Sequence, residues 1–177
     1  MSTDDETRPA ARPTVLTGPS GAGRDGVVER VRARFPSVWV PVPVTTRPPG
    51  TGERDGVDRH FVTPAEFDRL VAGGELLEWF RMGPHLRGTP REPLRTRLAQ
   101  GRPVLLPLDL PGALAVRAVL PGVDLVLLSP PGWRASPAVA EAVAHTVVHG
   151  LTEQAVTELV GLLGSSYLAP ARPPLRG

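Results

Sequence analysis

The sequence predicts an α/β fold, in which a parallel sheet core with helices on both faces carries an inserted α+β lobe. Three observations predict it. Short apolar runs alternate with helical patterns at 14–35 and again at 103–163, which is typical of strand–helix–strand units. A glycine-rich turn separates the first apolar run from the first helical pattern. Residues 38–90 break this rhythm, so we assign them to the inserted lobe. We expect one domain at 14–164, a disordered tail at 1–13 and a flexible tail at 165–177.

The first elements of the core follow from hydrophobic periodicity. "PTVLTG" (13–18) predicts a buried strand that ends in a glycine turn, and "GVVERVRARF" (26–35) predicts a helix with one apolar face. "SVWVPVPVTTR" (37–47) predicts an extended segment, but Pro41 and Pro43 remove backbone donors from it. We therefore place this segment at a sheet edge or in the peripheral lobe.

The later elements have clearer boundaries. Thr63, Pro64 and Glu66 have the spacing of a capping box with proline at the first helical position. The helix that they open stops at Gly73 and Gly74. The second half predicts helices at 93–101, 112–122 and 152–164 and strands at 103–110, 123–129 and 145–150.

Composition and charge exclude several classes of protein. With 41% hydrophobic and 21% charged residues the chain is typical of a soluble globular protein, and no apolar run reaches the ~18 residues of a membrane span. The absence of cysteine excludes disulfides, thiolate metal sites and cysteine nucleophiles. All 20 basic residues are arginine, so the pI of about 10.3 reflects the high pKa of arginine, while the net charge is only +2. We expect a cytoplasmic protein with no nucleic-acid partner, no membrane partner and no metal site.

The stretch "GPSGAGRD", from Gly18 to Asp25, has the glycine spacing of a phosphate-binding loop. The usual pattern G-x-x-x-x-G-K-[ST] places a lysine on the nucleotide phosphates and a hydroxyl on Mg²⁺. Arg24 keeps the charge of that lysine but has a bulkier head group, whereas the Asp25 carboxylate repels phosphates. In a chain without lysine, the change at Arg24 alone is ambiguous. The candidate phosphate-loop residues are Gly18, Ser20, Gly21, Gly23, Arg24 and Asp25.

Four motifs occur in a fixed order: "TTRPPGTGERDGVDRHFVTPAEF", "GELLEW", "GTPREP" and "VLLPLDLPGALAVR". Together they resemble the guanylate kinase family, whose members phosphorylate GMP with ATP. The resemblance runs from about Thr14 to Leu163. It implies a core of the P-loop type, a GMP-binding lobe and a lid that closes over ATP.

In that family a glutamate, a serine or threonine, and an aspartate read the guanine base. The resemblance carries these roles to Glu78, Thr89 and Asp109. The chemistry is consistent, because guanine presents N1–H and an exocyclic amine as donors, which suit carboxylates. Its O6 is an acceptor, which suits a hydroxyl.

The acceptor-phosphate site is altered relative to the family. The resemblance carries one phosphate-binding arginine to Arg47, whereas Gly50 stands in place of the second and Pro43 in place of a serine. Arg59 and Arg87 stand where the family has two tyrosines. Guanidinium groups suit phosphate oxygens. Either the pocket favours a more highly charged guanine ligand, or these are solvated arginines in a decaying site.

The ATP side departs further. Pro107 stands where the family has an acidic residue linked to the metal, two positions before Asp109. The segment after Pro131 runs almost directly to the final strand, so we expect the lid to be largely absent apart from Arg134. Positioning and charge neutralisation account for nearly all of phosphoryl-transfer catalysis. Arg24 and Arg134 are the candidate catalytic residues that remain.

These observations predict a guanylate-kinase-like protein that binds GMP or another guanine nucleotide and in which phosphoryl transfer is weak or lost. One alternative is an active guanylate kinase that converts ATP and GMP to ADP and GDP, with Mg²⁺ and ATP as cofactors. A second alternative is an interaction module that holds a phosphorylated protein partner through Arg47, Arg59 and Arg87.

Overall fold

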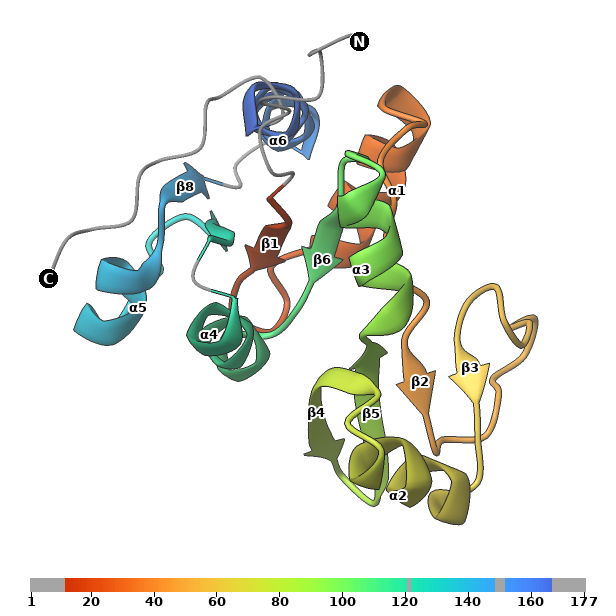
Figure 1. Cartoon of the computed structure of the whole chain (residues 1–177). Helices are drawn as coiled ribbons and strands as arrows, with labels where there is room; N and C mark the ends of the chain where they lie inside the picture. The colour runs from red at the N-terminus through yellow and green to blue at the C-terminus, as the bar shows by residue number, and fades with distance from the viewer. Residues whose placement is uncertain (1–11, 121, 149–151, 167–177) are drawn as a thin grey trace, which may run out of the picture.

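The computed structural model describes residues 12–120, 122–148 and 152–166 (Figure 1). Its core is a sheet of four parallel strands in the order β6-β1-β7-β8. The strands are β1 (Thr14–Thr17), β6 (Leu105–Pro107), β7 (Asp124–Ser129) and β8 (His145–Val148). Each lies within an apolar run that the sequence predicts as a strand.

Helices cover both faces of this sheet (Figure 1). They are α1 (Arg24–Arg34), α4 (Leu110–Val119) and α6 (Thr152–Ser166). Leu16 and Val126 pack in one cluster with α1 and α6, whereas Val15 and Leu125 pack in another with α4. Successive side chains of a strand point to opposite faces, so an unbroken apolar run can bury both faces of a parallel sheet. The predicted parallel core with helices on both faces is confirmed.

The lobe is built on a second four-stranded sheet that lies beside the core, with α3 (Glu92–Ala99) between the two in Figure 1. Its strand order is β3-β2-β5-β4. The strands are β2 (Val44–Thr45), β3 (His60–Phe61), β4 (Leu76–Met82) and β5 (His85–Pro90). Phe67 of α2 (Pro64–Ala72) is fully buried against one face, in a cluster with Val44 and Leu76.

The start of α2 agrees with the sequence. The Thr63 hydroxyl accepts a hydrogen bond from the Glu66 backbone N–H, and the Glu66 carboxylate accepts one from the Thr63 backbone N–H. Two backbone donors that the helix leaves unpaired are thereby satisfied. The predicted capping box is confirmed.

The structure adds elements that the periodicity did not indicate. Strands β4 and β5 form a hairpin, and β2 lies between β3 and β5, inside the lobe sheet rather than at its edge. In the predicted extended segment 37–47, Trp39 forms an isolated parallel bridge with Val104, next to the core sheet. A short helix, α5 (Pro137–Ala142), lies between β7 and β8, where we expected an almost direct connection. Ser136 caps this helix by accepting a hydrogen bond from the Val139 backbone N–H.

The predicted tails fall mostly outside the described residues. Residues 1–11 and 167–177 are not described, and α6 extends to Ser166, so it includes the first two residues of the predicted C-terminal tail. Among the described helices, none combines the length and the apolar character needed to cross a membrane.

Candidate functional site

One face of the lobe sheet gathers the residues that the resemblance assigns to GMP. In the strand register Glu78 is paired with Thr89, and Arg87 is paired with Thr45 on its other side. Residues paired across strands share a face, as do residues two apart on one strand, so Glu78, Thr89 and Arg87 lie on the same face. Helix α2 covers the opposite face, where Val44 points. The alternation of the strands therefore separates a polar face from the apolar packing under α2.

Glu78 and Thr89 form a buried hydrogen-bonded pair. Glu78 is 7% exposed and Thr89 is 4% exposed. The Thr89 hydroxyl donates to Glu78 Oε1 at 2.6 Å. Glu78 Oε2 is buried and has no hydrogen-bond partner within the described part of the chain. Burial raises the pKa of Glu78, and the hydrogen bond from Thr89 opposes that shift. A buried oxygen without a partner is costly, and a donor from a ligand would satisfy it.

Asp109 reaches the same place from the core. It caps α4, and its Oδ1 accepts a hydrogen bond from the Gly112 backbone N–H at 2.8 Å. A Cβ at Gly112 would stand 2.8 Å from Asp109 Oδ1 and 3.4 Å from Glu78 Oε2. A side chain at this position would collide with Asp109 Oδ1, whereas the Glu78 oxygen would lie at ordinary contact distance. The Asp109 charge also contributes to the raised pKa of Glu78. The structure thus brings Glu78, Thr89 and Asp109 together.

Two of the candidate arginines are joined through a carboxylate that the sequence did not single out. Arg47 Nη2 donates to both oxygens of Glu53, at 2.8 and 2.9 Å, and Arg59 Nε donates to Oε1 at 3.3 Å. The Gly50 backbone N–H also donates to Glu53, at 2.6 Å. The hydrogen bond from Arg47, followed by that from Gly50, lowers the pKa of Glu53 to about 2. Glu53 lies within the first of the four ordered motifs, "TTRPPGTGERDGVDRHFVTPAEF", but its place in a loop does not predict which side chains it contacts.

Arg87 is half-buried, and its side chain makes no hydrogen bond or ion pair with the described residues. Burial lowers the pKa of Arg87, and the positive charges of Arg59 and Arg24 lower it further. The negative charges of Glu78 and Asp25 act in the opposite direction. The guanidinium group therefore lies within electrostatic reach of both the lobe and the glycine-rich loop, and the cluster of cations favours an anion.

The glycine-rich loop between β1 and α1 keeps the geometry that its glycines predict. Gly21 and Gly23 have positive φ angles of 81° and 73°, a conformation that side chains disfavour. A Cβ at Gly18 would stand 2.5 Å from the backbone oxygen of Leu128, so β1 and β7 pack closely at this point. A cavity of about 220 Å³ lies against the loop, lined by Pro19, Gly21, Ala22, Gly23, Arg24, Asp25 and Gly26.

The two candidate catalytic arginines differ in their surroundings. Arg24 Nη1 donates to the backbone oxygen of Leu108 at 2.5 Å, so its guanidinium group is directed at the turn between β6 and α4. Arg134 is exposed in the segment between β7 and α5, and no hydrogen bond or ion pair joins it to another described residue. Ser20 is exposed as well. The structure brings Arg24, but not Arg134, into contact with the elements that carry the guanine-reading candidates.

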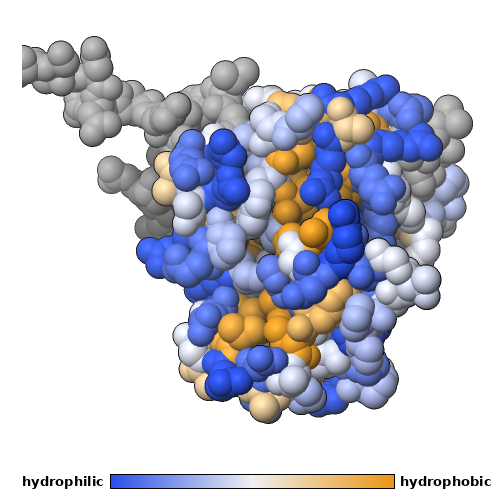
Figure 2. Space-filling view, turned by 90° about the vertical axis from the view of Figure 1, so that its right-hand side faces the viewer, coloured by the Kyte–Doolittle hydropathy of each residue, from blue (hydrophilic) through white to orange (hydrophobic). Residues whose placement is uncertain are grey.

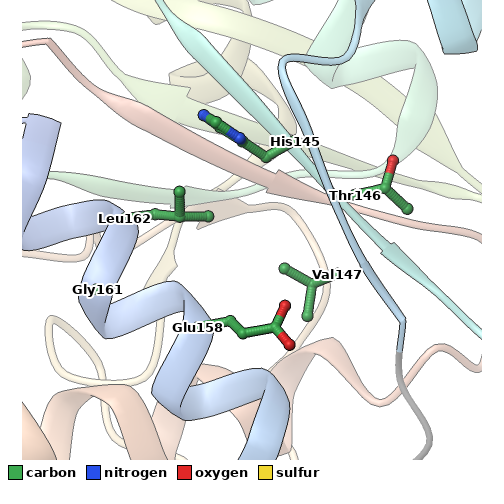
Figure 3. A pocket seen from close by; sticks show the side chains of 6 residues that line it. All are labelled: His145, Thr146, Val147, Glu158, Gly161 and Leu162. Carbon is green, nitrogen blue, oxygen red and sulfur yellow. The ribbon is translucent and has the colours of Figure 1, made fainter.

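Other hollows of the described structure lie outside this site. One, of about 300 Å³, lies between β8 and α6, where Glu158 extends toward Val147 (Figure 3). Another, of about 280 Å³, lies on the α2 side of the lobe sheet and is lined by Val44, Val62, Leu70 and their neighbours. Figure 2 shows apolar surface over the lobe. Within the described residues, no three histidine, aspartate or glutamate side chains gather as a metal-binding group.

The family of the chain follows from comparison with known proteins. The family model of guanylate kinase matches residues 10–147. The chain belongs to the guanylate kinase family. The resemblance of the four ordered motifs is thereby confirmed.

Curated guanylate kinases are closely similar over part of the chain. The guanylate kinase of Thermobifida fusca (strain YX) is 58% identical over 122 residues, which are 69% of this chain and 62% of that protein. That of Frankia casuarinae is 53% identical over 118 residues, covering 67% of this chain and 64% of the relative. The chain thus spans less than two thirds of the length of these relatives.

A solved guanylate kinase from Anaplasma phagocytophilum has the same fold. It superimposes with a TM-score of 0.74 at 23% identity, over 90% of this chain and 88% of the other. This likeness confirms the predicted α/β class of the guanylate kinase fold. The loss of the lid and the loss of phosphoryl transfer stay predictions, and the relatives favour the active-kinase alternative over loss of transfer.

Proposed function

We propose that this member of the guanylate kinase family binds GMP on the polar face of its lobe sheet. The buried, unpaired Oε2 of Glu78 carries the proposal, because it lies beside Asp109 and needs a donor that the described residues do not supply. Guanine offers two such donors, N1–H and the exocyclic amine. The Thr89 hydroxyl donates its hydrogen to Glu78 Oε1 and so holds this carboxylate in place, and Arg59 and Arg87 give the phosphate a cationic surrounding.

The same geometry supports selection against adenine. Adenine presents an N1 acceptor where guanine presents N1–H, so it would leave the Glu78 oxygen without a donor. A site with a buried polar group discriminates strongly against a ligand that leaves that group unpaired. We expect AMP to bind far more weakly than GMP.

We further propose that phosphoryl transfer from ATP is weak. Three features support this: Arg24 is engaged by a backbone oxygen, Asp25 replaces the metal-binding hydroxyl of the loop pattern, and Pro107 offers no ligand. Of the two positions linked to Mg²⁺, Asp25 has a carboxylate oxygen and Pro107 has no side-chain donor. Pro107 leaves one of the two Mg²⁺-linked positions without a ligand, so the Mg²⁺ site of the loop pattern is incomplete and we derive no catalytic step through the metal.

An active guanylate kinase is the second candidate, and the 50–58% identical relatives named guanylate kinase favour it. In that case ATP and GMP give ADP and GDP, with Mg²⁺ as cofactor. Arg24 would have to leave the Leu108 oxygen, or another cation would have to act on the transferred phosphoryl group. A phosphorylated protein partner held by Arg59 and Arg87 is a further use of the same cationic face.

Two measurements test these proposals. Calorimetric titration with GMP, and with AMP for comparison, tests binding; failure to bind GMP would refute the proposed function. A coupled assay of ADP release with GMP and Mg-ATP tests transfer. Turnover above about 1 s⁻¹, the low end for kinases, would establish the active kinase and reject weak transfer. A phosphopeptide that competes with GMP would point to the protein partner.

A further inference from the structure

Arg24 joins two parts of the molecule that are distant in sequence. It is the first residue of α1, and its side chain reaches the oxygen of Leu108, 84 residues away. The backbone N–H of Leu108 is used by the core sheet, where it donates to the Leu16 oxygen at 3.0 Å. Leu108 is only 5% exposed, so water has little access to this backbone unit. The charged donor therefore satisfies a backbone oxygen that would be costly to leave unpaired.

The peptide that Arg24 holds leads directly into Asp109. Asp109 has an extended backbone and caps α4 through the Gly112 backbone N–H. The orientation of the Leu108–Asp109 peptide sets the direction in which the Asp109 side chain leaves the backbone. The Gly112 N–H at the start of α4 then holds Oδ1, so the position of the other carboxylate oxygen is fixed as well. The position of a Cβ at Gly112, 3.4 Å from Glu78 Oε2, places this carboxylate beside the unpaired oxygen of Glu78.

A second observation places Arg24 near the lobe. The charges of both Arg24 and Asp25 act on Arg87, which stands on β5 beside the guanine-reading candidates. The start of α1 and the polar face of the lobe are thus within electrostatic range of each other. Both the hydrogen bond to Leu108 and the effect of Arg24 on Arg87 indicate that the Arg24 guanidinium extends toward the turn before α4 and the polar face of the lobe.

We propose that Arg24 is a positioning residue for guanine recognition: it holds the Leu108–Asp109 peptide so that the Asp109 carboxylate faces the base, and it does not bind donor phosphates. This inference rests on the proposed binding of GMP in the lobe. It accounts for an arginine at a position where the loop pattern has lysine, because the longer, forked side chain reaches the Leu108 oxygen.

The test replaces Arg24 and measures base recognition in the full chain. Arg24→Lys restores the lysine of the loop pattern, and Arg24→Met keeps the aliphatic stem without a donor. Arg32→Lys is the matched control, because Arg32 is an exposed residue of the same helix whose side chain makes no hydrogen bond to another described residue. Calorimetry gives the affinities for GMP, for IMP, which lacks the exocyclic amine, and for ATP. Cooperative thermal unfolding confirms that each variant is folded.

We expect both Arg24 variants to bind GMP about tenfold more weakly, the effect of displacing one hydrogen bond to a charged group. The preference for GMP over IMP falls as well, while ATP affinity and the Arg32→Lys control are unchanged. If Arg24→Lys keeps its GMP affinity and changes its ATP affinity, Arg24 is a phosphate ligand and the inference is wrong. Failure of the wild-type chain to bind GMP rejects the proposed function and this inference together, whereas equal GMP binding by wild type and variants rejects only the inference.

A measurement without ligand separates positioning from a general loss of structure. The amide ¹H–¹⁵N signals of Asp109 and Gly112 should shift in both Arg24 variants and stay in place in Arg32→Lys. Signals that do not move in the folded Arg24 variants would overturn the inference, whatever the result with GMP.

Discussion

Replacing Glu78 by glutamine tests the proposed reading of guanine most directly. The Thr89 hydroxyl holds Oε1 at 2.6 Å, and Oε2 is the oxygen left for the base. Glutamine keeps the size of the side chain and an oxygen for Thr89, but it turns an NH₂ group toward the guanine donors. One charge-assisted hydrogen bond contributes about 1.5–3 kcal/mol, so Glu78→Gln should weaken GMP binding about tenfold to a hundredfold.

Calorimetric titration with GMP and AMP measures this effect. The glutamine NH₂ can donate to adenine N1, so the affinity for AMP should fall less than that for GMP, or rise. Glu75→Gln is the matched control, because Glu75 is exposed at the start of the same hairpin and its side chain makes no hydrogen bond to a described residue. GMP affinity within twofold of wild type in Glu78→Gln would refute the role that we assign to this carboxylate.

The same variant has an expected pH dependence. Because burial raises the pKa of Glu78 above its ordinary value of 4.5, the folded state binds more protons than the unfolded state in this range. The free energy of unfolding therefore falls as pH rises from about 4.5 through the raised pKa. Glu78→Gln lacks this term, so its stability relative to wild type should increase from pH 4 to pH 8 in urea unfolding. A constant difference across that range would contradict the raised pKa.

Three further substitutions test contacts in the lobe and the core. The pKa of Glu53 is lowered to about 2, mainly by Arg47, so the stabilising charge of Glu53 is lost as pH falls from about 4.5 to 2. Glu53→Gln has no such charge to lose, so its stability should fall less than that of wild type over this range, as measured by unfolding at a series of pH values. Thr63→Ala removes the cap of α2 and should cost about 1 kcal/mol in urea unfolding. Gly18→Ala places a Cβ 2.5 Å from the Leu128 oxygen. Since this oxygen belongs to the backbone of β7 and Gly18 directly follows β1, the substitution should cost about 1–3 kcal/mol by the same measurement.

Matched variants serve as controls for these three. Glu29→Gln changes an exposed carboxylate of α1 that makes no hydrogen bond or ion pair with a described residue, and it should leave the acid transition unchanged. Thr51→Ala, at an exposed loop position, should leave stability within 0.5 kcal/mol of wild type, about the range of ordinary surface changes. Gly26→Ala meets no atom within 4 Å, so it should preserve or raise stability where Gly18→Ala lowers it. A Gly18→Ala variant as stable as wild type would show that the contact with Leu128 does not oppose a side chain at this position.

Much of the architecture could be predicted from local patterns. The apolar runs predict the four core strands, because a strand of a parallel sheet is buried on both faces and needs no polar alternation. The capping box at Thr63 predicts the start of α2, because its donors and acceptors lie within three residues of one another. The hairpin of β4 and β5 was not indicated, since its residues alternate only partly and Gly83–Pro84 also occurs in ordinary loops. Helix α5 has only six residues, too short for a periodic pattern.

The candidate site was predicted less completely than the fold. The positions of Glu78, Thr89 and Asp109 come from motifs that resemble the family, and the structure adds that they lie together. The sequence did not indicate Glu53 as the common partner of Arg47 and Arg59. These contacts depend on the path of a loop, which no periodicity describes.

The sequence by itself determined the α/β class, the inserted lobe and the family, because repeating apolar patterns, caps and ordered motifs can be read along the chain. Only the tertiary structure decided where the side chains act. It turned Arg24 toward Leu108, set Asp109 beside Glu78 near Gly112, and left one Glu78 oxygen buried with no partner among the described residues. The physical reason is that burial and hydrogen bonding between distant residues arise only when the elements pack, so the same arginine in the same loop pattern can face a phosphate or a backbone oxygen.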